Sequence, residues 1–213
     1  PATGSELFKY DGSSLTAIDV NSGEGSSHPY YFTAVGSRLY FIANTPATGV
    51  DVFQYDGTTL TALDINPGAA SSSPNILRDV AGVLYLSATT PATGFELYRH
   101  DGTTLSVVDV WSGASGSEPN EMTAVGSTVF FRATTPATGW ELFRFDGSTL
   151  SVIDVNVGTG HSNPYEMNNV GGVLYFRATT PGTGYELFKY DGTTLTAIDV
   201  NAGTGDSWPE FLT

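Results

Sequence analysis

The chain repeats itself every 45 residues, and this period constrains its fold more than any other feature. The letters PATG begin at Pro1, Pro46, Pro91 and Pro136, and PGTG begins at Pro181. The chain therefore reads as one domain of repeats 1–45, 46–90, 91–135 and 136–180, followed by a partial repeat 181–213. Self-similarity at a fixed period of this length is typical of repeat architectures.

Each repeat contains four short strand-like segments. The first set covers residues 30–36, 38–44, 50–56 and 59–65 and is rich in β-branched and aromatic residues. Gly, Pro and Asp-Gly pairs separate the segments, which is typical of antiparallel strands joined by hairpins. Their polar and apolar residues do not alternate cleanly, as expected of strands covered on both faces. Four strands in about 45 residues predict a blade of a β-propeller.

Counting strands predicts an all-β, five-bladed propeller of four-stranded antiparallel blades. Residues 1–20 supply the two outer strands of one blade, and residues 209–213 begin an inner strand. We therefore expect both termini to meet in a composite closing blade. That blade lacks its second strand, which either lies outside the recorded chain or comes from another segment by strand exchange. An unpaired edge favours pairing with another chain, so self-association through the incomplete blade is a further expectation.

The segments ELFKYDG, DVFQYDG, ELYRHDG and ELFRFDG resemble the ELWxxDGT repeat proteins of bacteria, with Phe or Tyr in place of the Trp. The later DVNxGxGSxP and AVGxxLYF patterns are also similar to that family, and the likeness covers the whole chain. The resemblance implies a propeller-like module of a secreted or cell-surface protein and implies no catalytic activity. Five blades also make the architecture similar to the tachylectin-2 type of lectin, although no lectin motif matches residue by residue.

Charge and composition exclude several classes of partner. The net charge is −14, from 22 acidic against 8 basic residues, so the surface repels the phosphates of nucleic acids. No apolar run is long enough to span a bilayer, and there is no Cys for disulfides or thiolate metal sites.

The loops vary between repeats while the strands stay constant, and loops on a rigid scaffold are where binding sites usually lie. In a propeller, the loop between blades and the residue after the Thr-Gly pair emerge on one face. Exposed aromatic rings there suit sugar stacking or a protein hot spot, although packing against neighbouring loops is the alternative. The candidate ligand-binding residues are Tyr30, Trp111, Trp140, Tyr165, Tyr185 and Trp208.

The loops between blades also contain a calcium-like spacing of oxygen-bearing side chains. The candidates are Asp19, Asn21, Asp154, Asn156, Asp199 and Asn201. Each loop offers essentially one carboxylate, whereas calcium takes several. The competing interpretation is an Asp that fixes the loop by accepting backbone N–H groups, and we expect no cofactor.

The remaining polar residues predict structural roles. If Ala133 pairs with Trp140, the pairs Arg132–Glu141 and Arg177–Glu186 lie across neighbouring strands as ion pairs. The three His residues form no catalytic triad or metal-binding pair, so we expect that the protein is not an enzyme.

The sequence thus predicts a non-catalytic binding module at the cell surface or outside the cell, with a glycan as the first ligand hypothesis and a protein as the second. One alternative is a structural module that joins proteins in an adhesive assembly, a longer repeat array or a filament. The other is an engineered repeat scaffold without a ligand.

Overall fold

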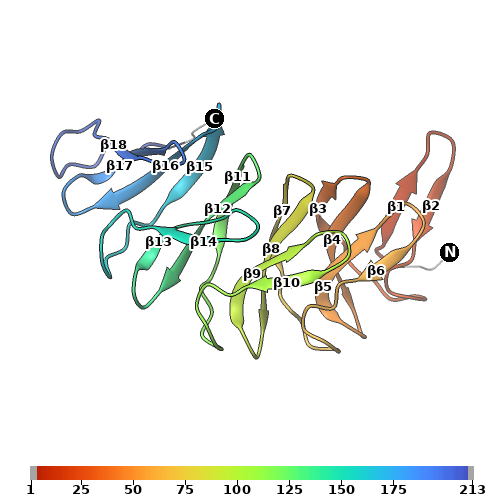
Figure 1. Ribbon diagram of the computed structural model, residues 1–213. Coiled ribbons are helices and arrows are strands. Elements are labelled where there is room, and N and C mark those ends of the chain that lie inside the picture. The colour runs from red at the N-terminus through yellow and green to blue at the C-terminus, as the bar shows by residue number, and fades with distance from the viewer. Residues whose placement is uncertain (1–3, 211–213) are drawn as a thin grey trace.

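The computed structural model describes residues 4–210 of the 213-residue chain and shows eighteen β-strands in five sheets. The first sheet contains only β1 (Leu7–Tyr10) and β2 (Leu15–Ile18). Each of the other four contains four antiparallel strands. Figure 1 shows the sheets following one another along an arc. Within residues 4–210 there is no helix that could cross a membrane.

The four complete sheets repeat one strand order, and we call them blades 2 to 5; the two-stranded sheet is the half-blade. Blade 2 consists of β3 (Tyr30–Val35), β4 (Arg38–Thr45), β5 (Gly49–Tyr55) and β6 (Leu60–Ala62). Blade 3 consists of β7 (Asn75–Val80), β8 (Val83–Thr90), β9 (Gly94–His100) and β10 (Leu105–Val108). Blade 4 consists of β11 (Asn120–Val125), β12 (Thr128–Thr135), β13 (Gly139–Phe145) and β14 (Leu150–Ile153). Blade 5 consists of β15 (Tyr165–Val170), β16 (Val173–Thr180), β17 (Gly184–Tyr190) and β18 (Leu195–Ile198).

Apolar side chains on both faces of each sheet pack against the neighbouring blades and hold the blades together. Between blades 4 and 5, Phe130 and Leu142 pack with Phe176 and Phe188 in one buried cluster. Burying a side chain of this size contributes about 1.5–3 kcal/mol. Because each sheet takes two strands from one repeat and two from the next, neighbouring repeats are also interlocked through their backbones.

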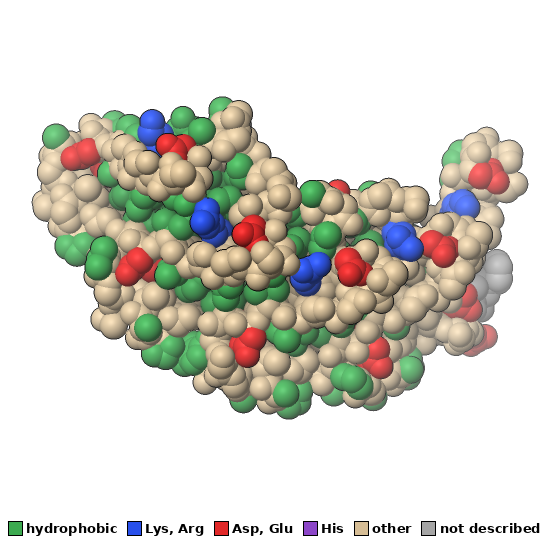
Figure 2. Space-filling view, viewed as in Figure 1, with side chains coloured by type: hydrophobic (Ala, Val, Ile, Leu, Met, Phe, Trp, Pro, Cys, Tyr) green, Lys and Arg blue, Asp and Glu red, His purple; other side chains and the backbone are tan. Residues whose placement is uncertain are grey.

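Basic side chains add a polar tie between neighbouring blades. Arg99 Nη1 donates to the carbonyl oxygen of Gly147 at 2.7 Å, and Arg144 makes the same bond to Gly192 at 3.3 Å. Each acceptor belongs to the Asp-Gly turn of the following blade. Figure 2 shows Lys and Arg side chains along the arc, with Asp and Glu side chains beside them.

A buried carboxylate joins each blade to the loop that leaves it. Glu141, which is fully buried in β13, accepts the backbone N–H of Val155 at 2.8 Å. It also accepts the backbone N–H and the hydroxyl of Ser162 at 2.9 and 2.7 Å. Burial of charge is costly unless hydrogen bonds compensate it; these donors offset part of that cost, and burial still raises the pKa of Glu141. We call this arrangement the carboxylate latch. It recurs at Glu6, Glu96 and Glu186, whose partner serines are Ser27, Ser117 and Ser207.

The predicted ion pairs Arg132–Glu141 and Arg177–Glu186 are wrong. Ala133, rather than Arg132, lies opposite Glu141, and Arg132 lies opposite Leu142. Neighbouring residues of a strand point to opposite faces, so the guanidinium and the carboxylate are on different sides of the sheet. The same register separates Arg177 from Glu186, and Arg177 pairs with Glu210 instead at 3.7 Å.

The β-propeller class predicted from the repeat is confirmed by the blade topology. The composite closing blade is not formed within residues 4–210, because β1 and β2 pair only with each other there. In Figure 1, these strands and β15–β18 lie at opposite ends of the arc. The inner strand expected at residues 209–213 lies largely outside the described residues, and no strand is present at 209–210.

The contribution of the carboxylate latch to stability can be tested in blade 2, because Asp51 stands there in place of Glu. Its shorter side chain accepts Ile65 N–H at 3.1 Å, and the buried hydroxyl of Ser72 makes no hydrogen bond of 3.5 Å or less with the described residues. We expect Asp51→Glu to reach Ser72 and raise the free energy of unfolding by about 1 kcal/mol. Urea unfolding measures this change. The same substitution paired with Ser72→Ala is the control and should remove the gain; destabilisation by Asp51→Glu alone would contradict this interpretation.

The pH dependence of stability should contain two opposing contributions. Hydrogen bonds from the backbone of Thr59 and Thr58 lower the pKa of Asp56 from 3.8 to about 2. Its stabilising contribution is therefore present above pH 3.8 and lost as pH falls through about 2. Burial raises the pKa of Glu96 above 4.5, so its contribution is present below pH 4.5 and lost as pH rises through the raised pKa.

Carboxyl-carbon NMR titration should find the pKa of Asp56 below its ordinary value and the pKa of Glu96 above its ordinary value. In acid unfolding, Asp56→Asn should lose less stability than the unmodified chain as pH falls through the Asp56 transition. Equal acid sensitivity of the two chains would contradict the assignment.

Candidate functional site

An arginine lies between two aromatic rings where blades 4 and 5 meet. The guanidinium carbon of Arg132, on β12, is 4.1 Å from the ring centroid of Trp140 and 4.3 Å from that of Tyr165. Arg132 also donates to the Tyr165 hydroxyl and to Asn163 Oδ1, the latter at 3.2 Å. Cation–π contacts at such distances contribute about 0.5–2 kcal/mol, more when they are desolvated.

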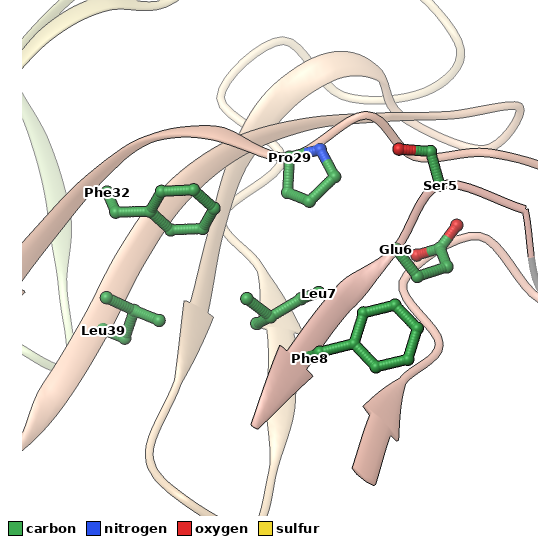
Figure 3. Close-up of a pocket in the computed structure, with 7 residues that line it drawn as sticks. All are labelled: Ser5, Glu6, Leu7, Phe8, Pro29, Phe32 and Leu39. Atoms are coloured by element: carbon green, nitrogen blue, oxygen red, sulfur yellow. The ribbon is translucent and has the colours of Figure 1, made fainter. Parts of the chain in front are cut away.

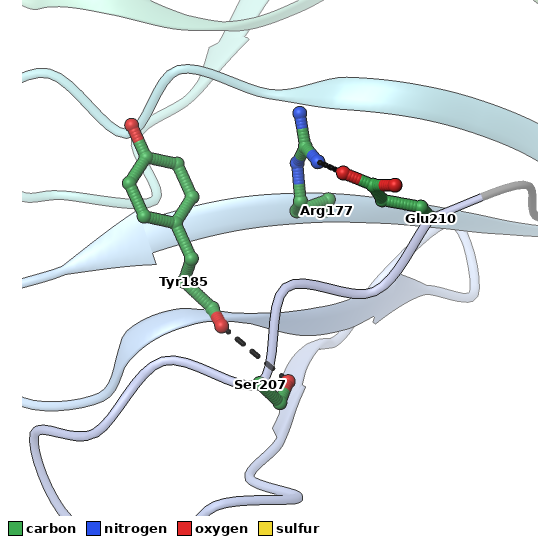
Figure 4. A network of polar contacts seen from close by, with 4 residues as sticks. All are labelled: Arg177, Tyr185, Ser207 and Glu210. Carbon is green, nitrogen blue, oxygen red and sulfur yellow. Dashed lines mark hydrogen bonds and ion pairs between the residues drawn. The ribbon is translucent and has the colours of Figure 1, made fainter.

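A second arginine continues this arrangement along the same edge. Arg177, on β16, lies 5.7 Å from the Tyr165 ring, 6.0 Å from Tyr185 and 5.8 Å from Trp208. The rings of Tyr185 and Trp208 stack with centroids 4.3 Å apart. Figure 4 shows Arg177 beside Glu210, with Tyr185 and Ser207 close by. We call the continuous set Arg132, Trp140, Tyr165, Arg177, Tyr185 and Trp208 the arginine–aromatic ladder.

The residues of the ladder occupy equivalent positions in two consecutive repeats. Arg132 and Arg177 are 45 residues apart, as are Trp140 and Tyr185. The same step relates Asn163 to Trp208 and Tyr165 to Glu210. The earlier blades carry Ile42 and Ser87 where the ladder has arginine. The scaffold is therefore constant, and Arg132 and Arg177 contact aromatic rings at the junction of blades 4 and 5 and between blade 5 and the loop that leaves it.

The carboxylate latch fixes the loops that carry this ladder. Ser162 precedes Asn163, and Ser207 precedes Trp208, so each latch serine is adjacent to a residue of one junction. Asn163 and Trp208 have φ of 45° and 48°, a conformation that non-glycine residues rarely adopt. The strain is held in place by backbone hydrogen bonds to the third strand of the blade that each loop leaves: Asn163 N–H donates to the Trp140 carbonyl at 3.2 Å, and Trp208 N–H donates to the Tyr185 carbonyl at 3.4 Å.

Four of the six predicted aromatic residues lie in the ladder, and two do not. Tyr30 begins β3 and contacts the ring of Tyr31 at 5.4 Å. Trp111 lies in the loop after β10, where its backbone N–H donates to Glu96 at 3.1 Å. Sequence reasoning missed the two arginines as site residues. Their recurrence beside aromatic residues in two consecutive repeats was the signal that could have identified them.

The calcium candidates hydrogen-bond within their own loops. The carboxylates of Asp19, Asp154 and Asp199 accept the backbone N–H of the glycine four residues later, at 3.2, 3.1 and 3.2 Å. The amides of Asn21, Asn156 and Asn201 donate to the carbonyl five residues later. Within the described part of the chain, no three His, Cys, Asp or Glu residues are grouped as for a metal. The expectation of no cofactor, with calcium as the weaker alternative, stays a prediction.

Two of the histidines also have structural partners. His161 Nδ1 accepts the backbone N–H of Trp140 at 2.8 Å, and Asp206 accepts that of Tyr185 at 2.7 Å in the next repeat. These two side chains therefore help to position the aromatic residues of the ladder. His100 is buried beside the Tyr40 hydroxyl, and burial lowers its pKa.

A separate acidic feature lies on the innermost strands. Glu121 and Glu166 stand at β-bulges with φ of 54°, and both line a pocket of about 320 Å³ with Arg78. Burial, followed by repulsion from Glu166, raises the pKa of Glu121. Sequence reasoning missed this pair, because a bulge that redirects a side chain leaves no clear signature in a strand pattern.

Comparison with known proteins identifies the fold. No family model matches the chain, and no curated protein matches it in sequence. It is similar to the β-propeller domain of the Trilobed protease from Pyrococcus furiosus, which is described as having an open velcro topology. The TM-score is 0.51 at 12% identity, covering 78% of this chain and 53% of that one.

Two further solved structures are similar. The acylaminoacyl peptidase of Pyrococcus horikoshii has a TM-score of 0.52 at 12% identity, covering 79% of this chain and 26% of that one. The SapL1 lectin in complex with alpha methyl fucoside has a TM-score of 0.44 at 10% identity, covering 92% and 72%. This chain thus spans about half of the first structure and a quarter of the second. Identities this low show a β-propeller fold and leave the ligand to be argued from the site.

Proposed function

We propose that this chain is a non-catalytic binding module that holds a glycan on its arginine–aromatic ladder. The observation that carries the proposal is the continuous alignment of four aromatic rings and two guanidinium groups, from the junction of blades 4 and 5 to the loop that leaves blade 5. Aromatic rings stack on the apolar faces of sugars, and guanidinium groups donate several hydrogen bonds in a fixed plane.

Trp208 is the most accessible ring of the ladder. Its side chain is 51% exposed even though it stacks on Tyr185. A ring held in position by a neighbour loses little conformational freedom when it binds a ligand, which reduces the cost of association. This preorganisation supports Trp208 as a platform for a sugar ring.

The charge of the ladder favours an anionic sugar. Arg132 has no carboxylate within 4.0 Å among the described residues, although it lies in a chain of net charge −14. Arg177 is already paired with Glu210, so Arg132 is the cation of the ladder with no carboxylate in direct contact in residues 4–210. Such a partly buried cation favours an acidic ligand group, and a carboxylate can accept two parallel hydrogen bonds from one guanidinium. A glycan that contains uronic or sialic acid therefore fits the site better than a neutral one.

A binding role also agrees with how the repeated carboxylates are used. Glu96 and Glu141 accept hydrogen bonds from backbone and serine groups of the loops that leave their blades, so these carboxylates are used by the scaffold. A secreted or cell-surface location follows from the ELWxxDGT resemblance and from a ligand that occurs outside cells. Both remain part of the proposal.

The test is a glycan array that contains matched acidic and neutral oligosaccharides. We expect binding to acidic members, and we expect Trp208→Ala and Arg132→Gln each to weaken it by roughly tenfold or more, as for central residues of other binding sites. Trp111→Ala is the matched control, because Trp111 lies outside the ladder, and it should bind as the unmodified chain does.

Two results would overturn the proposal. One is a folded chain that binds no glycan on the array, which would favour the ligand-free scaffold. The other is binding that falls with Trp111→Ala and not with Trp208→Ala, which would place the site elsewhere on the loops.

A further inference from the structure

One residue of the arginine–aromatic ladder is held by three consecutive residues of the loop between blades 4 and 5, both of which are complete sheets. The backbone N–H of Trp140 donates to His161 Nδ1 at 2.8 Å. The carbonyl oxygen of Trp140 accepts the backbone N–H groups of Ser162 and Asn163 at 3.0 and 3.2 Å. The loop therefore fixes the backbone on both sides of the Trp140 side chain.

These contacts continue from Trp140 to the arginine of the same junction. The guanidinium carbon of Arg132 lies 4.1 Å from the ring centroid of Trp140. Arg132 also donates to Asn163 Oδ1 at 3.2 Å, which returns the chain of contacts to the loop. A change in the side chain of His161 thus reaches the ladder through Trp140.

The acceptor role of His161 recurs in the other repeats with different side chains. In the half-blade, Ser5 occupies the place of Trp140 beside the latch residue Glu6 (Figure 3). Four side chains accept the N–H at this position, at 2.9, 2.9, 2.8 and 2.7 Å: Ser26, Ser71, His161 and Asp206. The third repeat carries Gly116 there. The acceptor is therefore general, whereas the imidazole occurs in one repeat.

An imidazole differs from the other acceptors because a proton abolishes its capacity to accept. A backbone N–H can only donate, so Nδ1 of His161 carries no proton and the ring proton lies on Nε2. In the imidazolium, both nitrogens carry protons and neither accepts, whereas a serine hydroxyl retains its lone pairs. Histidine side chains ordinarily change charge between about pH 5 and 8. Protonation would therefore turn two N–H groups toward each other, and the ring would have to move away.

The surroundings of His161 offer no compensating ion pair. Its ring is exposed, and no carboxylate in residues 4–210 lies within 4.0 Å of it. The charged side chains of the elements around the loop are Arg132, Glu141, Asp154, Glu166 and Arg177. Of these, Glu141 is a second group whose protonation could reach the loop, because it accepts from Ser162 and burial raises its pKa. An experiment must separate the two.

We propose that His161 is a positioning residue that makes ligand binding by the arginine–aromatic ladder dependent on pH. At neutral pH, His161 holds the N–H of Trp140. As the ring takes up a proton in weak acid, Trp140 is held only through its carbonyl oxygen, and its contact with Arg132 loses its fixed geometry. The ladder therefore binds its ligand more weakly in weak acid. The effect on binding rests on the proposed glycan function, whereas the coupling of His161 to Trp140 does not.

An NMR titration of the full chain between about pH 5 and 8 tests this coupling without a ligand. We expect the backbone amide shift of Trp140 to change with the same midpoint as the imidazole carbons of His161. His161→Ser, which copies the acceptor of the first two repeats, should remove that transition. His28→Asn is the matched control and should retain it, because His28 lies in the loop before blade 2 and asparagine occupies the equivalent position 163.

Two results of this titration would overturn the inference. One is a Trp140 amide shift that does not change with the protonation of His161 in the unmodified chain. The other is a transition that persists in His161→Ser, which would assign the effect to Glu141.

Calorimetric binding of a trisaccharide of galacturonic acid extends the test to the ladder. Salt at about 0.3 M screens the attraction between an exposed imidazolium and the acidic ligand, and the ligand carboxylates stay ionised above about pH 5. We expect the dissociation constant to rise by about threefold or more from about pH 7.5 to about pH 5, as for the loss of one hydrogen bond. The rise should disappear in His161→Ser and persist in His28→Asn.

The binding data separate this inference from the proposed function. An equal rise of the dissociation constant in the unmodified chain and in His161→Ser would overturn the inference and leave glycan binding intact. If no acidic oligosaccharide of the array binds at either pH, the proposed function fails, and the NMR titration still decides whether His161 couples Trp140 to pH.

Discussion

The buried carboxylate at the start of the third strand is the interaction on which the rest of the structure depends. Glu141 and its equivalents bring the backbone N–H of the outgoing loop and a serine hydroxyl together inside the sheet. These donors would otherwise be buried without partners, which is costly. One side chain in each repeat thus closes its blade and fixes the direction in which the chain leaves for the next one. Apolar packing then holds the blades in sequence.

The separation between constant latch residues and variable neighbouring residues explains how a chain with nearly identical repeats can carry a unique site. The latch holds Ser162 and Ser207 in place, and the neighbouring residues Asn163 and Trp208 are free to differ. At the junction of blades 4 and 5 and in the loop after blade 5, the variable positions contain arginine and aromatic residues that contact one another, and they form the ladder. Binding chemistry can therefore change without disturbing the scaffold, since the latch hydrogen bonds involve a glutamate, a serine and backbone groups.

The fold could be predicted because the signals that define it are local. Asp-Gly turns, Thr-Gly loops and apolar segments recur every 45 residues, and each determines a turn or a strand. Strand register was less accessible: the predicted pairing of Ala133 with Trp140 is shifted by one residue from the observed pairing with Glu141. Register is weakly specified by sequence when both faces of a sheet are apolar, because either phase buries hydrophobic residues. A slip of one residue was enough to suggest ion pairs in place of the latch.

The site itself could be predicted only in part. Variable aromatic residues pointed to Trp140, Tyr165, Tyr185 and Trp208, since unusual residues in a repeat stand out. Their contact with Arg132 and Arg177 depends on side-chain direction across two blades, and a linear pattern does not contain that information. The closing blade likewise depends on the curvature of the whole array, which no single repeat encodes.

Amide hydrogen exchange in Ser207→Ala tests most directly whether the latch positions the binding loop. In this variant, the hydroxyl that donates to Glu186 at 2.6 Å is removed, and the strands of blade 5 keep their ladder of backbone bonds. The account predicts that exchange at Trp208 becomes faster by about tenfold or more while exchange within β17 stays unchanged. Unchanged exchange at Trp208 would contradict it, because the loop would then be held by something other than the latch.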